Sequence, residues 1–207
     1  MPSTNPAPSN LLTAAARDHL RPLGLFQKGK SRIWLDDHGW WLCIVEFQPG
    51  RSPGSYLNVG CMWLWLEKSH LSFDEGYRIE RHTKFREPAQ FAKEATRLAT
   101  RAAEEVQRYQ KLFPNVESVC EFYLRKNSLN PGDWQAFHAG VASAMSGKAA
   151  EADRFFDRFL AERDNRPDWL VAAQADAERL KALAGNTFEF RELVAERVKQ
   201  TRKLLKL

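Results

Sequence analysis

The sequence predicts an α+β fold: a small antiparallel β-sheet of three to four strands packed with an N-terminal helix and a long helix, followed by a helical C-terminal half. Three observations predict it. Strand-forming aromatic and branched residues fill most of the stretch from residue 31 to residue 67. Apolar residues recur every three or four positions between Phe91 and Phe113. Beyond residue 133, four further segments have helical spacing and are separated by glycine or proline.

The first half supplies one short helix and then the strands. Ser9 and Asn10 are good helix caps, and the helix predicted over residues 11–20 ends at Pro22 and Gly24. Turn-forming residues then divide the apolar runs, which predicts hairpins. The predicted strands cover residues 31–36, 40–48 and 55–67, with a charged fourth strand over 77–82 that suits a sheet edge.

The second half is predicted to be helical throughout. Pro88 suits the first turn of the long helix, and Pro114-Asn115 ends it. The later helices are expected over residues 116–125, 134–145, 149–162, 168–184 and 188–205. We therefore divide the chain into a disordered tail (1–8), an α+β domain (9–127) and a helical C-terminal region (128–207).

Composition limits the classes of function. The 207 residues carry a formal net charge of +5. There is no uninterrupted apolar run of about eighteen residues, so we expect no membrane span. Three scattered cysteines and a polar, proline-rich start predict a cytoplasmic protein. No two of the five histidines have the i, i+4 spacing of helical zinc ligands, and no phosphate-binding, dinucleotide or nucleophile-elbow motif is present. We therefore predict no metal, no cofactor and no catalytic residues, and an enzyme is the less favoured class.

Two pairs of residues are predicted to face each other across the second and third strands. Cys43 is expected opposite Cys61 and Trp41 opposite Trp63, with each pair either in register or one residue out of register. The thiols are interpreted as small core residues, with a redox switch as the alternative. The tryptophans of the sheet either form core or provide a stacking platform for a ligand, and strand alternation places Trp40 and Trp41 on opposite faces.

The candidate binding surface combines aromatic, histidine and basic residues. The basic strip either protects an edge strand or grips phosphates, and a second basic stretch covers residues 197–206. The candidate residues are Trp41, Trp63, Trp65, His70, Arg78, Arg81, Lys84 and Arg86.

One helical hairpin in the tail resembles a tetratricopeptide unit. Gly140, Gly147, Ala152 and Phe156 stand at the spacing of its two glycines, alanine and aromatic residue. No second copy is visible in the sequence, so we interpret the segment as a plain helical hairpin.

The first 70 residues or so resemble an uncharacterised bacterial family, domain of unknown function 4304. The resemblance lies in residues 20–26, in 28–34, in Val45-Glu46-Phe47-Gln48, and in Tyr56-Leu57-Asn58-Val59-Gly60. It implies an α+β fold and carries over no functional residues.

The hypothesis that follows is a non-catalytic module that binds another protein. It rests on a second strand that is apolar on both faces, on the helical tail and on the missing catalytic motifs. One version is a protein that neutralises a bacterial toxin. A homodimer that covers one face of the sheet is a further alternative. Weak nucleic-acid binding by the basic strips and a small-molecule or enzymatic cleft beside the sheet remain as competing hypotheses.

Overall fold

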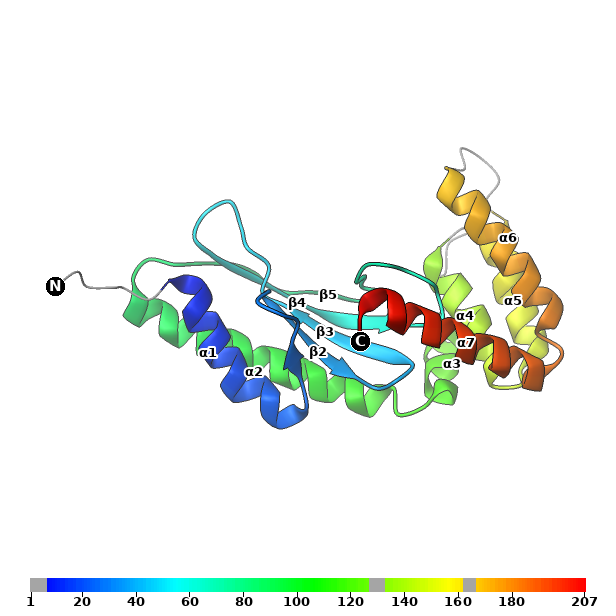
Figure 1. Ribbon diagram of the computed structural model, residues 1–207, viewed down its shortest axis with the longest axis horizontal. Helices are drawn as coiled ribbons and strands as arrows, with labels where there is room; N and C mark the ends of the chain where they lie inside the picture. The colour runs from blue at the N-terminus through cyan, green and yellow to red at the C-terminus, as the bar shows by residue number, and fades with distance from the viewer. Residues whose placement is uncertain (1–6, 127–132, 162–166) are drawn as a thin grey trace. The chain divides into compact units, whose positions relative to one another are not determined.

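The computed structural model describes residues 7–126, 133–161 and 167–207 (Figure 1). Within it the chain forms two compact units. Unit 1 comprises Met1–Trp63 and Leu71–Lys111, and unit 2 comprises Leu64–His70 and Leu112–Leu207. The division falls at residue 112, earlier than the predicted boundary between residues 127 and 128. Most of the tail predicted over residues 1–8 lies outside the described residues.

The α+β fold is confirmed, and unit 1 contains a five-stranded antiparallel sheet in the order β1-β2-β3-β4-β5. The count exceeds the three to four strands expected from the sequence. The additional strand is β1, whose two residues are too few to show alternation. The strands are β1 (Phe26–Gln27), β2 (Ile33–Asp37), β3 (Trp41–Glu46), β4 (Gly54–Trp63) and β5 (Glu75–Lys84).

The predicted register between β3 and β4 is confirmed. Cys43 lies opposite Cys61, and Trp41 lies opposite Trp63. All six residues of β3 except Glu46 are buried. Both faces of this central strand are therefore covered, as its two-sided apolar sequence requires.

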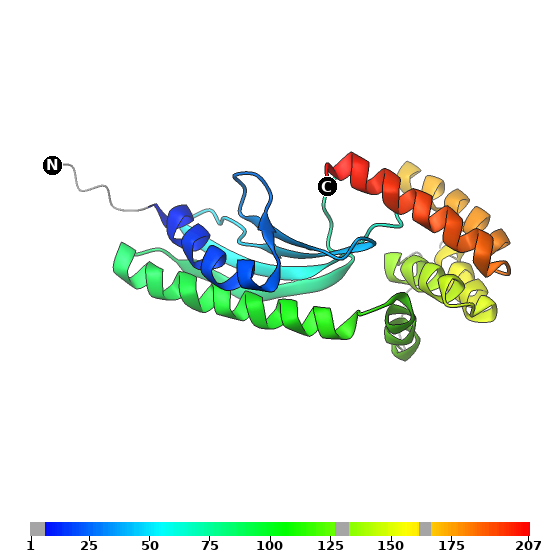
Figure 2. The same ribbon diagram turned by 60° about the horizontal axis from the view of Figure 1, so that its bottom comes forward.

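Helices α1 (Pro8–Leu20) and α2 (Pro88–Leu112) lie on the same face of the sheet (Figure 2). Buried side chains of α2 recur at helical spacing from Phe91 to Tyr109. Polar contacts join the same helix to the strands: Gln110 Nε2 donates to Asp36 Oδ2 at 2.9 Å, and Tyr77 Oη donates to Glu105 Oε1 at 3.2 Å. A short 3₁₀ turn, η1 (Arg21–Leu23), follows α1 and ends at Gly24, whose φ is +94°.

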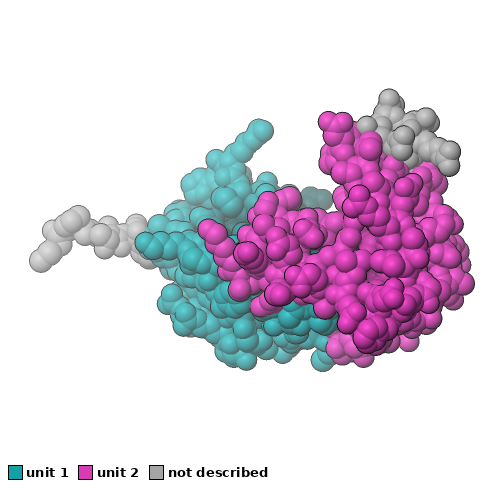
Figure 3. Space-filling view, turned by 45° about the vertical axis from the view of Figure 1, so that its right-hand side comes forward, with its two compact units in different colours: residues 1–63, 71–111 teal, residues 64–70, 112–207 magenta. Residues whose placement is uncertain are grey.

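The described part of unit 2 contains five helices and the short segment Leu64–His70 between β4 and β5. The two units are coloured separately in Figure 3. Within this unit, Trp65 Nε1 donates to Nδ1 of the fully buried His138 at 3.0 Å. The helices are α3 (Val116–Arg125), α4 (Trp134–Met145), α5 (Ala149–Leu160), α6 (Asp168–Leu183) and α7 (Thr187–Leu205).

Helices α4 and α5 form the predicted hairpin. Gly147 makes the turn with a φ of +72°. Gly140 admits the ring of Phe156, because a Cβ atom there would approach that ring to 2.8 Å. A second hairpin, α6–α7, begins 34 residues after the start of α4. Its two helices were expected from the sequence, but the tetratricopeptide spacing does not repeat in them, because buried Gln174 stands where the first hairpin has Gly140.

None of the described helices is long and apolar enough to cross a membrane.

Candidate functional site on the edge strand

The three tryptophans of the candidate surface are core residues. Trp41, Trp63 and Trp65 are each at most 1% exposed. The first two belong to the sheet of unit 1, and Trp65 belongs to unit 2. The structure therefore does not bring these side chains together with the basic strip on one accessible surface.

Trp40 corrects one sequence expectation. Its ring stacks on Trp63 at 5.8 Å, with 9° between the planes, and lies 6.1 Å from Trp41. The three indoles thus form one cluster, and Trp40 and Trp41 are not separated by the sheet. The physical reason is that Trp40 belongs to the turn before β3, where strand alternation does not apply.

The turn before β3 also holds an aspartate–histidine pair. His38 Nε2 and Asp36 Oδ2 are 2.6 Å apart, and the His38 ring stacks on Trp41 at 4.1 Å. Gly39 adopts a φ of +83° and donates its backbone N–H to Asp37 Oδ1. These contacts fix a tight turn, in agreement with the interpretation of this sequence as a hairpin turn.

The thiols of Cys43 and Cys61 are buried on the face of the sheet that α2 covers. Burial raises the pKa of the Cys61 thiol well above its ordinary value, and a hydrogen bond with Cys43 and the charge of Glu75 act in the same direction. Burial likewise raises the pKa of the Tyr109 hydroxyl. Because the thiolate is the reactive form, this environment makes Cys61 a poor nucleophile in the folded protein.

This thiol makes stability fall at alkaline pH. In the unfolded chain a cysteine thiol has a pKa of about 8.5, whereas the raised pKa of Cys61 keeps this thiol protonated in the folded protein. Above that pH the unfolded chain loses a proton that the folded protein retains, so a further rise in pH favours unfolding. We expect the free energy of unfolding to fall between about pH 8.5 and pH 10, and to fall less steeply in Cys61→Ala. Urea unfolding at a series of pH values measures both slopes; equal slopes would contradict the assignment.

Arg78 occupies the sheet face opposite α2 and contacts only neutral acceptors. Its Nη2 donates to Gln48 Oε1 at 2.6 Å, and its Nε donates to Asn58 Oδ1 at 3.2 Å. The guanidinium also lies 4.1 Å from the ring centre of Tyr56. The side chain is therefore held in place while its positive charge has no carboxylate within ion-pair distance in the described residues.

The rest of the basic strip is exposed. Arg81, Lys84 and Arg86 make no ion pair within the described part of the chain. The acidic residue Glu80, which lies among these cations in β5, pairs with Arg97 of α2 at 2.9 Å. Charge therefore accumulates along one strand, because the neighbouring carboxylate faces the helix.

A pocket of about 340 Å³ lies beside this strip. Gly76, one of its lining residues, is paired in register with Gly60 of β4, and the two backbones approach each other closely there. A Cβ atom on Gly76 would lie 2.5 Å from Gly60 Cα, so only glycine fits there. The lining residues are Asn58, Phe73, Gly76, Tyr77 and Arg78.

β5 is the last strand of the sheet, so one of its edges has no neighbouring strand among the described residues. It is ten residues long, and its ladder with β4 is interrupted between Ser55 and Asn58. A free strand edge presents backbone N–H and C=O groups in a row. Together with Arg78, Arg81, Lys84 and Arg86, this edge forms what we call the basic edge.

The other candidate residues do not contribute to the basic edge. His70 is exposed and belongs to unit 2. In the second basic stretch, Arg197 pairs with Asp176 through both Nη atoms, and Lys199 lies 3.5 Å from Glu196. Intramolecular carboxylates thus neutralise part of that stretch. The described residues contain no cluster of three or more His, Cys, Asp and Glu side chains arranged to hold a metal ion.

Comparison of the chain with protein-family models, with curated proteins and with solved structures finds no match. The resemblance of the first 70 residues to domain of unknown function 4304 therefore stays a prediction. Any assignment of function has to come from the geometry of the basic edge and of the pockets.

Sequence reasoning found the cations of the basic edge but missed its pocket. Phe73 and Tyr77 are 41% and 53% exposed and flank that pocket. The available indication was a pair of glycines, Gly60 and Gly76, inside or beside predicted strands, since glycine in a strand often marks a close approach of two backbones.

Proposed function

We propose that this protein is a binding module whose basic edge pairs with an extended, acidic segment of a partner protein. The observation that carries the proposal is the coincidence of a free ten-residue strand edge with cations that have no carboxylate partner among the described residues. Strand addition to such an edge uses backbone hydrogen bonds for affinity and side chains for selectivity.

Charge supports an acidic segment as the occupant. In an added antiparallel strand, side chains lie directly opposite those of β5, and opposite charges at such positions are favourable. Arg81 and Lys84 would meet carboxylates of the partner. The same charges disfavour pairing of β5 with β5 of a second copy, because that arrangement brings cations of both chains together.

The pocket supplies a place for an apolar side chain of the partner. Exposed Phe73 and Tyr77 flank it, and Arg78 closes one side. An acidic segment with one aromatic or branched residue would fill it. At protein interfaces, most of the binding energy commonly comes from a few side chains that fill pockets and are surrounded by a polar rim.

A charge-reversal pair tests the proposal. The probe is a ten-residue peptide in which glutamate alternates with valine or threonine, matched in length to β5. We expect Arg81→Glu/Lys84→Glu to weaken peptide binding at least about tenfold, because attraction becomes repulsion at two positions. Lys93→Glu/Lys111→Glu changes two exposed cations of α2 by the same amount and is the matched control.

Isothermal titration calorimetry at low salt measures both variants. The control is expected to bind within about twofold of the unmodified protein, since a distant exposed charge acts only through the screened overall field. Equal weakening by both pairs would show that only net charge matters, and would contradict a site on the basic edge.

Nucleic acid is a second candidate, favoured by the exposed rings of Phe73 and Tyr77 beside the cations. It predicts that an oligothymidylate binds more tightly than the acidic peptide and that its affinity falls steeply with salt. The side chains argue against it: Tyr77 Oη is tied to Glu105, and Arg78 covers the face of Tyr56.

A further inference from the structure

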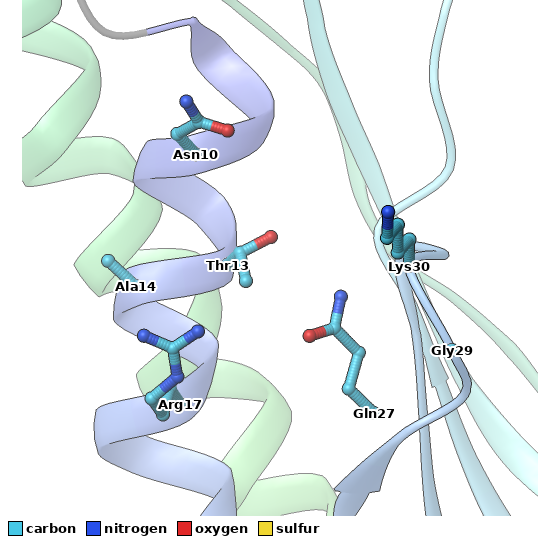
Figure 4. Close-up of a pocket in the computed structure, with 7 residues that line it drawn as sticks. All are labelled: Asn10, Thr13, Ala14, Arg17, Gln27, Gly29 and Lys30. Atoms are coloured by element: carbon cyan, nitrogen blue, oxygen red, sulfur yellow. The ribbon is translucent and has the colours of Figure 1, made fainter.

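A second pocket in unit 1 lies between α1 and the turn that joins β1 to β2 (Figure 4). Its volume is about 390 Å³, within the range of roughly 300–1,000 Å³ typical of small-molecule sites. Two of its lining residues are cationic, and none is acidic. The lining residues are Asn10, Thr13, Ala14, Arg17, Gln27, Gly29 and Lys30.

One wall of the pocket is a single face of α1. Asn10, Thr13 and Arg17 are spaced by three and four residues, so they stand one above another on this helix. In Figure 4 the side chain of Thr13 points toward the hairpin. This face therefore offers an amide, a hydroxyl and a guanidinium to the same space.

The opposite wall is the β1–β2 turn. Gln27 Nε2 donates to the backbone carbonyl of Ser31 at 2.6 Å, which fixes this side chain across the gap from Thr13. Gly29 adopts a φ of +58°, which bends the turn so that Lys30 follows on the same wall. The two cations thus approach the pocket from different elements.

The two cations of this pocket have no acidic partner among the residues that the structure describes. Arg17 and Lys30 make no ion pair with any described residue, whereas Arg97, Arg101 and Arg108 of α2 each pair with a glutamate. A cavity lined by one sign of charge attracts ligands of the opposite sign. The hydroxyl and amide groups add neutral hydrogen-bond donors.

We propose that this pocket binds a small phosphate monoester. Arginine and lysine together suit a phosphate group, since the guanidinium offers paired donors and the ammonium a compact charge. The polar groups of Asn10, Thr13 and Gln27 suit the hydroxyls of the organic part. The absence of any carboxylate from the lining makes a cationic ligand unfavourable.

Calorimetry at low salt with three probes tests the proposal: a hexose 6-phosphate, inorganic phosphate and the unphosphorylated hexose. We expect saturable binding of the hexose phosphate, weaker binding of inorganic phosphate and none of the neutral sugar. Arg17→Gln/Lys30→Gln should weaken hexose phosphate binding at least about tenfold, because both charged donors are lost. Arg21→Gln/Lys93→Gln, at exposed positions outside the pocket, should change it less than about twofold.

Both variants alter exposed side chains, so near-UV circular dichroism should show an unchanged fold. Failure of the hexose phosphate to bind, or equal weakening by the two variants, would overturn the proposal. Inorganic phosphate binding as tightly as the ester would overturn the assignment of a monoester. The basic edge is untouched in these variants, so binding of the acidic peptide should not change.

Discussion

Gly76→Ala is expected to destabilise the protein by more than about 3 kcal/mol, because backbone stands where the new Cβ atom must go. That atom would lie 2.5 Å from Gly60 Cα and 2.6 Å from the Val59 carbonyl oxygen. The φ of Gly76, +144°, is also one that residues with side chains rarely adopt. Denaturant unfolding followed by circular dichroism measures the change.

Gly39→Ala is the matched control for this substitution. Its φ of +83° is also positive, but nothing lies within 4 Å of the added Cβ atom. We expect a loss of only about 1–2 kcal/mol, the cost of the left-handed conformation alone. If the two variants lose the same stability, β4 and β5 do not approach each other closely at Gly76, which lines the pocket of the basic edge.

Trp63→Ala is expected to cost about 3–5 kcal/mol, the range for truncating a large aromatic residue in a core. Trp63 is fully buried and contacts the rings of Trp40 and Trp41. Its loss leaves a cavity in the centre of the indole cluster. Near-UV circular dichroism should report the loss of coupled tryptophan bands, and denaturant unfolding the loss of stability.

Phe188→Ala provides the comparison for Trp63→Ala. Phe188 is 72% exposed on α7, so its truncation should change the free energy of unfolding by less than about 0.5 kcal/mol. A small effect of Trp63→Ala, similar to that of Phe188→Ala, would contradict the placement of the sheet tryptophans in the core.

The spacing of apolar residues in the sequence predicted most of the helices and strands. Apolar spacing placed α2 within one residue of its observed end. Turn residues placed the hairpin so that Cys43 was expected opposite Cys61 or one residue out of register, and the first of these is observed. These patterns work because burial of one face repeats every two residues in a strand and about every 3.6 in a helix. The strand β1 was not predicted, because its two residues are too few to show an alternating pattern.

The candidate site was predictable only in part. The cations of the basic edge lie within nine residues of sequence, from Arg78 to Arg86, and an edge strand was expected there. Which carboxylates neutralise which cations depends on side-chain direction: Glu80 turns to Arg97, whereas Arg78 turns to Gln48 and Asn58. No sequence motif connects the residues that line the pocket between α1 and the β1–β2 turn. Only the folded chain places Arg17 and Lys30 in the lining of one pocket.

Hydrogen exchange of the β5 amides, followed by NMR with and without the alternating glutamate peptide, tests the central claim most directly. Strand addition predicts that amides of β5 pointing away from β4 gain protection, and that a peptide N-methylated at alternate residues binds far more weakly. Peptide binding without new protection in β5, or equal binding of the N-methylated peptide, would contradict strand addition at the basic edge.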